Sequence, residues 1–408
     1  MPLGVEAPPI VGVGAHLKST GAITAGDGVV VSQHIGDLDS TKTGEAFHAA
    51  LDSLERLYRV TPVAVAVDRH PDYLSTAYGR ALGLPVTAVQ HHYAHLAACM
   101  ADNDLAGPVL GAVWDGTGYG DDGTVWGGEF LRATDVGFER VASLRPFRLI
   151  GGDRAAREPR RAALGVVAAM GPGMVARWRR QRPDVFADDE WRVLGRAEAR
   201  GVNAPVTTSM GRLVDAVAGL AGVRDVMRFE GQAAMLLEQA VDPAEHQAYP
   251  THLVPPDPAW FPGAWAPPPM VVDWAPMIEA LLDDLDRHVP VGAIAARVHL
   301  ALADALVAVA TALGERRLLL TGGCFQNRVL TEAAIARLRA AGVQPYWHQR
   351  LPPNDGGIAA GQVVAWLRAH GYSRPGRNGR AAGQAAAPAD PEGIPVAAGC
   401  PRRHRAGR

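Results

Sequence analysis

The sequence predicts an α/β protein, because apolar runs of strand length alternate with segments of helical spacing along most of the chain. Residues 63–67 are wholly apolar and end at Asp68, as expected of a buried parallel strand. Residues 44–59 repeat apolar side chains at helical spacing. Residues 318–320 form another buried strand that runs into a glycine turn. Together these segments favour sheets that are covered by helices.

The first part of the chain alternates between strand and helix. The predicted strands are residues 9–16, 28–33, 63–67 and 86–89, and the predicted helices are residues 44–59, residues 77–82 and a helix that begins near His91. The strand at 86–89 follows Pro85 and is expected to be short and buried. The pattern is that of an α/β layer architecture.

The second part of the chain begins with a strand and is mainly helical afterwards. The predictions are a strand at 109–114 that ends at Asp115, a turn at 121–123, helices over 155–245, an irregular Pro- and Trp-rich loop at 250–275, and helices over 274–315 and 358–368. After Gly371 the chain is rich in Arg, Gly, Ala and Pro, which predicts a disordered tail.

The composition argues against several classes of protein. The 408 residues have a net charge of −2, without the basic excess of nucleic-acid-binding domains, so no nucleic-acid partner is expected. No apolar run reaches the ~18 residues of a membrane span, and the N-terminus does not resemble a signal peptide, so no membrane partner is expected. The cysteines Cys99, Cys324 and Cys400 form no zinc or disulfide pattern, which fits a reduced, cytoplasmic protein.

Two histidines four residues apart are the most informative feature of the chain. His91 and His95 stand at the start of a predicted helix, so both imidazoles would lie on one helical face, where a pair can bind one metal ion. Solvated or core histidines are the simpler alternative for an isolated pair. His92 points about 100° away from His91 around the helix, and we interpret it as a neighbour of the pair.

Three glycine-containing turns could approach a nucleotide or an ion closely. Residues 115–118 (Asp-Gly-Thr-Gly) follow a strand, with a plain hairpin turn as the alternative. Gly322 and Gly323 join a strand to a helix whose N-terminus favours anions, and here the alternative is an ordinary turn. Asp355 precedes two glycines and a helix, so it could cap that helix, bind a metal, or do both.

Three other segments carry charged residues with simpler explanations. Arg212 and Asp215 lie three apart on one helical face, which is typical of a surface salt pair. Glu230 opens the next helix and would complement its dipole. Asp153 follows a Gly-Gly pair and precedes a basic helix.

These segments, in their order along the chain, resemble one protein family. The motifs are residues 14–20 (GAHLKST), 32–38, 70–76 (HPDYLST), the histidine helix, and residues 115–120, 126–129, 151–153, 209–215, 230–231, 321–323 and 355–357. They are similar to the C-terminal transferase region of the hydrogenase maturation carbamoyltransferases (HypF), over residues 9–370. Several of the motifs are long, so the resemblance is specific.

The resemblance implies two actin-like (RNase-H-like) lobes with a nucleotide and a metal ion between them. It also implies kinship with O-carbamoyltransferases and with tRNA threonylcarbamoyladenosine transferases. The implied ligands of Fe(II) or Zn(II) are His91, His95, Asp115 and Asp355. The implied sites for an adenine nucleotide (ATP, AMP or carbamoyl-adenylate) are Lys18, Thr20, Thr117, Asp153, Asp215 at the ribose, Gly231, Gly322, Gly323 and Asn327. His34 and Asp72 are candidates for proton transfer.

The resemblance also suggests how the chain is divided. We expect an N-terminal extension at 1–8, a first lobe at 9–107, a second lobe with helical insertions at 108–350, a C-terminal helix that closes the first lobe at 351–371, and the disordered tail at 372–408.

The implied reaction is carbamoyl transfer from carbamoyl-adenylate to the C-terminal cysteine thiolate of HypE, in the maturation of the cyanide ligands of [NiFe]-hydrogenase. Full-length relatives carry an adenylate-forming domain before this region. Here the first motif begins almost at the N-terminus, three cysteines cannot build the zinc module of those relatives, and the tail after residue 371 is too short for an adenylate-forming domain. A separate protein or domain is therefore expected to supply the adenylate. The alternatives are an O-carbamoyltransferase acting on a small-molecule hydroxyl, tRNA modification, and a non-catalytic nucleotide-binding maturation scaffold.

Overall fold

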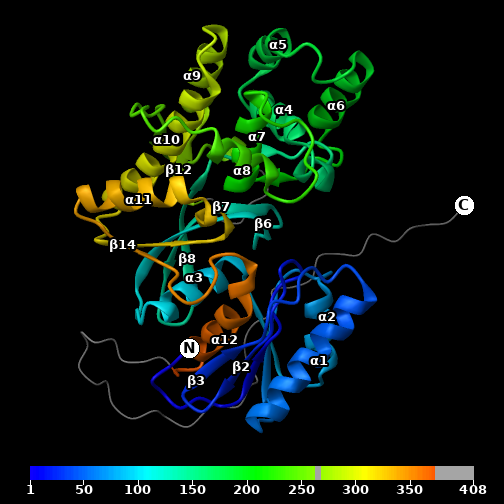
Figure 1. Cartoon of the computed structure of the whole chain (residues 1–408), viewed down its shortest axis with the longest axis vertical. Helices are drawn as coiled ribbons and strands as arrows, with labels where there is room; N and C mark the ends of the chain where they lie inside the picture. Colours follow the sequence, from blue (N-terminus) through cyan, green and yellow to red (C-terminus); the bar gives the residue numbers. More distant parts are fainter. Residues whose placement is uncertain (262–267, 373–408) are drawn as a thin grey trace, which may run out of the picture.

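The computed structural model describes residues 1–261 and 268–372, which form two mixed β-sheets with helices around them (Figure 1). The predicted two-lobed α/β fold is confirmed. Apart from Tyr372, the tail that we expected to be disordered lies outside the described residues.

The first sheet has five strands and a helix layer on each face. Its order is β3 (Gly28–Val31), β2 (Ala22–Ala25), β1 (Ile10–Gly12), β4 (Ala64–Asp68) and β5 (Val86–Val89), with β1, β4 and β5 parallel. Because side chains alternate along a strand, Val11 and Val65 pack with Phe47 of α1 (Thr41–Tyr58), near α2 (Leu74–Ala81). Ile10 and Ala64 face the opposite way, toward α12 (Ile358–Ala369).

The second sheet has nine strands and forms the larger core. The strands are β6 (Val109–Tyr119), β7 (Val125–Ala133), β8 (Phe138–Leu144), β9 (Phe147–Arg148), β10 (Val206–Thr207), β11 (His252–Val254), β12 (Met270–Asp273), β13 (Arg317–Thr321) and β14 (Gln344–Trp347). Their main path runs β11-β12-β8-β7-β6-β13-β14. The strand β13 is parallel to both β6 and β14.

Helices of the second lobe lie beyond this sheet (Figure 1). They are α4 (Pro159–Ala169), α5 (Pro172–Gln181), α6 (Asp188–Arg200), α7 (Met210–Leu220), α8 (Gln232–Gln239), α9 (Ala275–Asp286), α10 (Val291–Ala312) and α11 (Arg328–Ala340). By length and composition α10 could cross a membrane, but 72% of its most apolar window is buried inside the protein. It is therefore a core helix.

Two helices join the lobes. The helix α3 (His91–Asp102) packs on β6, β7 and β13 of the second sheet, whereas α12 packs on β1 to β4 of the first. The two helices also pack on each other at Gly361, where a Cβ atom would lie 1.9 Å from the carbonyl oxygen of Ala94. Only glycine allows this close approach, which brings the start of α3 near the turn before α12.

Three predictions about local structure were wrong. Strand β5 lies at the edge of its sheet, so Val86 is 42% exposed instead of buried. Strand β6 continues past Asp115 to Tyr119, with a register shift that re-aims the chain between Trp114 and Gly118. The segment 250–275, predicted to be irregular, contributes β11 and β12 because β12 pairs with β8; residues 262–267 lie outside the described part.

Candidate functional site

The histidine pair stands at the N-terminus of α3, directly after β5. The side-chain oxygen of Gln90 accepts a hydrogen bond from the backbone N–H of Tyr93 (2.8 Å) and caps the helix at this point. His91 and His95 follow one turn apart and are 1% and 0% exposed. The four-residue spacing therefore places both imidazoles on one buried face, as the sequence predicted.

Two carboxylates from distant parts of the chain face the pair. Asp115 comes from the middle of β6, and Asp355 comes from the short helix η4 (Asp355–Gly357) that precedes α12. The Nε2 atom of His91 lies 3.5 Å from Asp115 Oδ2 and 3.7 Å from Asp355 Oδ1. The Nε2 atom of His95 lies 3.6 Å from each of the same oxygens. We call these four residues the His–Asp cluster.

The donor set of the cluster fits a metal ion. One ligand atom from each residue lies within 4.8 Å of the others. Within the described part of the chain, neither buried Nε2 atom has a hydrogen-bond partner. Bonds of about 2.1 Å in tetrahedral geometry would separate ligand atoms by about 3.4 Å, close to the observed spacing. Two imidazoles and two carboxylates suit Zn(II) or Fe(II).

The charges of the cluster favour its ionised carboxylates. Burial alone would raise the pKa of Asp355, as would the negative charge of Asp115, but the imidazoles of His91 and His95 lower it to about 2. The pKa of Asp115 is also held well below its usual value, because the two imidazoles outweigh its burial. Burial alone would lower the pKa of His91, but Asp68, Asp115 and Asp355 raise it well above its usual value. The cluster thus keeps two negative charges where a cation would sit.

His92 is buried beside the cluster and takes no part in it. Its Nδ1 atom lies 3.1 Å from the side-chain nitrogen of Gln90. Burial, and then the neighbouring His91, lower its pKa well below the usual value, so the ring is neutral. Its place agrees with its interpretation as a neighbour of the pair.

Asn354 caps the short helix η4, and Gly357 occupies the N-cap position of α12, so the helix-cap alternative for Asp355 is wrong. The Asn354 side chain accepts the backbone N–H of Gly356 at 3.0 Å. This leaves the Asp355 carboxylate free to face the histidines.

A cavity of about 390 Å³ opens beside the cluster, and we call it the metal-side cavity. Eight of the metal and nucleotide candidates line it: Lys18, Asp115, Thr117, Asp215, Gly231, Gly323, Asn327 and Asp355. The backbone N–H of Gly323 donates to Asp115 Oδ1 at 2.9 Å and steadies that carboxylate. Candidates for ion and nucleotide binding from both lobes therefore meet in one space.

Two of the other nucleotide candidates have structural contacts instead. Gly322 has a φ of 99°, and a Cβ there would lie 2.3 Å from the backbone oxygen of Trp114, so glycine is needed for packing against β6. The hydroxyl of Thr20 donates to the carbonyl of Gly356 at 2.9 Å and ties the first lobe to the turn that carries Asp355. Neither residue lines the metal-side cavity.

Arg212 and Asp215 form a buried pair, which corrects the prediction of a surface salt pair. Their side chains are 8% and 1% exposed, and Arg212 Nη2 lies 2.8 Å from Asp215 Oδ2. Burial raises the pKa of Asp215 to about 6, although Arg212 opposes the shift. Both residues lie on α7, and the pair faces inward because α7 packs on both α4 and β6.

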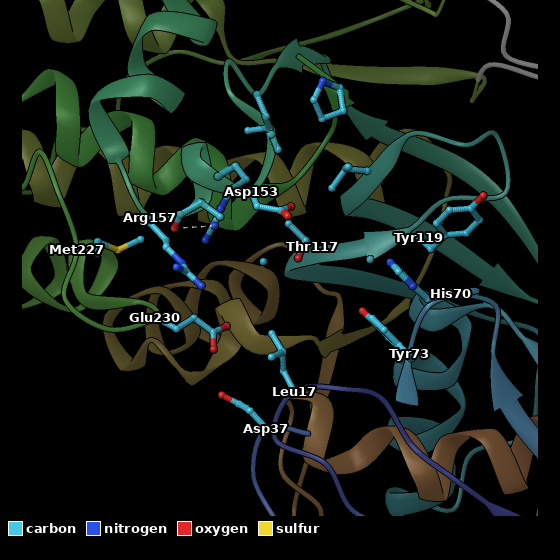
Figure 2. Close-up of a pocket in the computed structure, with 18 of the residues that line it drawn as sticks. Leu17, Asp37, His70, Tyr73, Thr117, Tyr119, Asp153, Arg157, Met227 and Glu230 are labelled. Carbon is cyan, nitrogen blue, oxygen red and sulfur yellow. Dashed lines mark hydrogen bonds between the residues drawn. The ribbon is translucent and has the colours of Figure 1, made fainter. Parts of the chain in front are cut away.

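A second cavity, of about 750 Å³, adjoins the first and shares Thr117, Arg212 and Glu230 with it. We call it the outer cavity. Figure 2 shows His70 and Tyr73 of the first lobe facing Tyr119, while Asp153 lies on the second lobe. The lobes are bridged at the shared boundary, where Lys18 Nζ lies 2.6 Å from Glu230 Oε2. Glu230 was expected only to complement a helix dipole.

His34 and Asp72 are not brought to this site. Both side chains are exposed on loops, and neither lines the metal-side or the outer cavity. His70, two residues before Asp72, does line the outer cavity, and Asp68 contacts His91 directly. The sequence signal for Asp68 was its place at the carboxyl end of a buried parallel strand, where polar groups of α/β sites gather.

The fold and the site define a two-lobed α/β protein with a candidate metal centre between its lobes. Residues 5–102 match the family model described as the HypF Kae1-like domain, and residues 111–362 match the second subdomain of the Kae1-like carbamoyltransferase domain. The chain therefore belongs to the HypF carbamoyltransferase family and corresponds to its Kae1-like region.

Individual relatives agree with this assignment. Carbamoyltransferase HypF of Synechocystis sp. is 37% identical over 387 residues, which are 89% of this chain and 48% of the relative. A carbamoyltransferase HypF homolog of Cupriavidus necator is 34% identical over 90% of this chain and 93% of its own length. A crystal structure of full-length HypF in a phosphate- and nucleotide-bound form superposes with a TM-score of 0.82 at 34% identity, over 90% of this chain and 47% of that one. The chain thus spans about half the length of most curated relatives that it matches.

Proposed function

We propose that this protein transfers a carbamoyl group from carbamoyl-adenylate to the C-terminal cysteine of a HypE-type acceptor during the maturation of [NiFe]-hydrogenase. The observation that carries the proposal is the His–Asp cluster, which opens into the metal-side cavity in a chain of the HypF family. A separate protein or domain would supply the adenylate, because the chain matches the Kae1-like region of its relatives. We expect the reaction to occur in the cytoplasm.

The transfer exchanges one bond for another at the carbamoyl carbon. The thiol first loses its proton to solvent, and the thiolate sulfur then forms a bond to the carbamoyl carbon. The C–O bond to the phosphate breaks, and AMP leaves with the electron pair. Zn(II) or Fe(II) held by His91, His95, Asp115 and Asp355 would supply Lewis-acid stabilisation of charge on oxygen.

The residues of the chain then position the two substrates. Lys18 would release Glu230 and neutralise the phosphate of the adenylate, because its ammonium group stands at the edge of the metal-side cavity. Asp215 and Asn327 line the same cavity and would hold the ribose and the base. The outer cavity, which meets the first at Thr117, would admit the acceptor, so the nucleophile and the donor approach from different sides.

A direct transfer assay tests the proposal. The purified chain, supplied with carbamoyl-adenylate, Zn(II) or Fe(II), and a peptide ending in the HypE-type cysteine, should add one carbamoyl group to the thiol, as measured by mass spectrometry. His91→Ala and Asp355→Ala should abolish the transfer, because each removes a metal ligand. His34→Ala and Asp72→Ala are matched controls that should retain it, because both residues lie outside the cavities.

The same assay separates the alternatives. Transfer that persists in His91→Ala would contradict a role for the cluster. Modification of a small-molecule hydroxyl instead of the peptide would favour an O-carbamoyltransferase. Nucleotide binding without transfer to either acceptor would favour a maturation scaffold.

A further inference from the structure

Asp68 contacts the His–Asp cluster from outside it. It is the last residue of β4, and its Oδ2 atom lies 2.7 Å from Nδ1 of His91. Both side chains are 1% exposed, so water does not compete for the contact. The contact joins β4, a strand of the first sheet, to α3 at the edge of the candidate metal site.

The geometry determines which imidazole nitrogen carries the proton. An ionised carboxylate can only accept hydrogen bonds, so Nδ1 of His91 must be the donor. In the neutral ring, which is the form that binds a metal, Nε2 then keeps its lone pair, and this is the atom that faces Asp115 and Asp355. Metal-binding histidines commonly have this arrangement, in which a carboxylate behind the ring sets the tautomer and raises ligand basicity.

The Asp68 carboxylate is itself held in place. Its Oδ1 atom accepts a hydrogen bond from the backbone N–H of His70 at 2.8 Å. The backbone carbonyl of Asp68 accepts a hydrogen bond from the hydroxyl of Thr76 at 3.2 Å. The His70 ring stacks on Tyr73 with 4.0 Å between ring centroids, and both residues line the outer cavity. A segment held by these hydrogen bonds and ring contacts therefore connects the wall of the outer cavity to the ring of His91.

His95 lacks such a support. Its Nδ1 atom is buried and, among residues 1–261 and 268–372, has no hydrogen-bond partner. The two histidines are therefore unequal, since the ring of His91 is oriented from behind and the ring of His95 is held by packing.

We propose that Asp68 is a positioning residue that fixes the tautomer and orientation of His91 and so sets the metal affinity of the His–Asp cluster. The proposal rests on the metal site of the proposed function. Loss of an outer carboxylate of this kind typically lowers metal affinity about 10- to 100-fold. Asp68→Ala should show such a loss. Asp68→Asn should fall between Asp68→Ala and the wild type, because its amide oxygen can still accept from Nδ1.

Co(II) and Zn(II) binding test the proposal without reference to turnover. Co(II) affinity is measured by competition with a chelating dye, and the visible absorption of bound Co(II) reports the geometry of the site. Asp121→Asn is the matched control, because Asp121 is paired with Arg69, the residue after Asp68, and does not contact the cluster. It should bind Co(II) as the wild type does, whereas Asp68→Ala should bind more weakly and with an altered spectrum.

Two outcomes distinguish the failure of this proposal from failure of the metal site. If Asp68→Ala binds Co(II) like the wild type while His91→Ala and Asp355→Ala do not, Asp68 has no positioning role. If His91→Ala and Asp355→Ala also bind like the wild type, the metal site itself is wrong. Should Asp68→Ala fail to fold, ¹⁵N NMR of the Zn(II)-loaded wild type decides, because the proposal requires a proton on Nδ1 of His91 and is overturned by one on Nε2.

Discussion

The two ends of helix α3 both carry buried ionisable residues. At one end the side-chain oxygens have hydrogen-bond donors, whereas at the other end the imidazole Nε2 atoms have no hydrogen-bond partner among the described residues. At the C-terminal end, Asp102 accepts the backbone N–H groups of residues 349–351 at 2.7–3.2 Å and the guanidinium of Arg350 at 2.9 Å. At the N-terminal end, the Nε2 atoms of His91 and His95 face carboxylates at 3.5–3.7 Å without forming hydrogen bonds.

Charge alone does not distinguish these two ends. The pKa of Asp102 is lowered, because hydrogen bonds from Arg350, Gln349 and Leu351 outweigh its burial. The pKa of Asp355 is also lowered, to about 2, by the imidazoles. The difference is geometric. A buried carboxylate whose oxygens have hydrogen-bond donors stabilises the fold, whereas nitrogens and carboxylate oxygens held slightly too far apart for hydrogen bonds leave room for an ion.

The largest expected effect is on the free energy of unfolding, at the C-terminal end of α3, where the buried carboxylate has its hydrogen-bond donors. Asp102→Ala should lower the free energy of unfolding by about 3–5 kcal/mol, because it leaves three part-buried backbone N–H groups without their acceptor, at about 1–3 kcal/mol each, and removes the partner of the half-exposed Arg350. Urea denaturation measures this change. Metal affinity per folded molecule should stay at the wild-type value. A loss of affinity comparable to that of His95→Ala would show that the two ends are not independent.

A smaller effect is expected at Asp215, a buried carboxylate with a single charged partner. Its pKa of about 6 in the folded protein exceeds the ordinary 3.8, so its contribution to stability is complete below pH 3.8 and is lost as the pH rises through 6. Relative to Asp215→Asn, the wild type should therefore lose about 2–3 kcal/mol between pH 4 and pH 7. Denaturation at several pH values measures the slope.

The Asp215 prediction has an internal control. The variant leaves Arg212 without its partner, but arginine stays charged throughout this range, so the cost is constant and does not change the slope. Parallel curves for the wild type and the variant would mean that Asp215 titrates as an exposed carboxylate does, and would contradict its burial.

The smallest effect is expected at the exposed bridge between the lobes. Lys18 and Glu230 are 30% and 55% exposed, so Glu230→Gln should change the free energy of unfolding by less than about 1 kcal/mol. Any change should shrink in high salt, because solvent-exposed charges are screened. A larger, salt-independent loss would show that this pair behaves like the buried contacts of Asp102.

Much of the site was predictable because its signals are local. The spacing of His91 and His95 places both rings on one helical face wherever the helix lies. The segments at Asp115, Gly323 and Asp355 were identified from the glycines beside them, and the order of the motifs identified the family. The errors concern the surroundings of particular residues, that is, whether their side chains are buried or exposed. The exposed edge of β5 and the burial of Arg212 and Asp215 depend on which elements lie alongside.

The sequence by itself determined the helices, most strands and the residue types of the site, because these follow from short-range spacing. The tertiary structure alone decided that Asp115 and Asp355 face the same two imidazoles, and that Asp68 stands behind one of them. The close packing of α3 on α12 at Gly361 and the register shift in β6 set those distances. Such distances depend on long-range packing, which no local pattern of residues encodes.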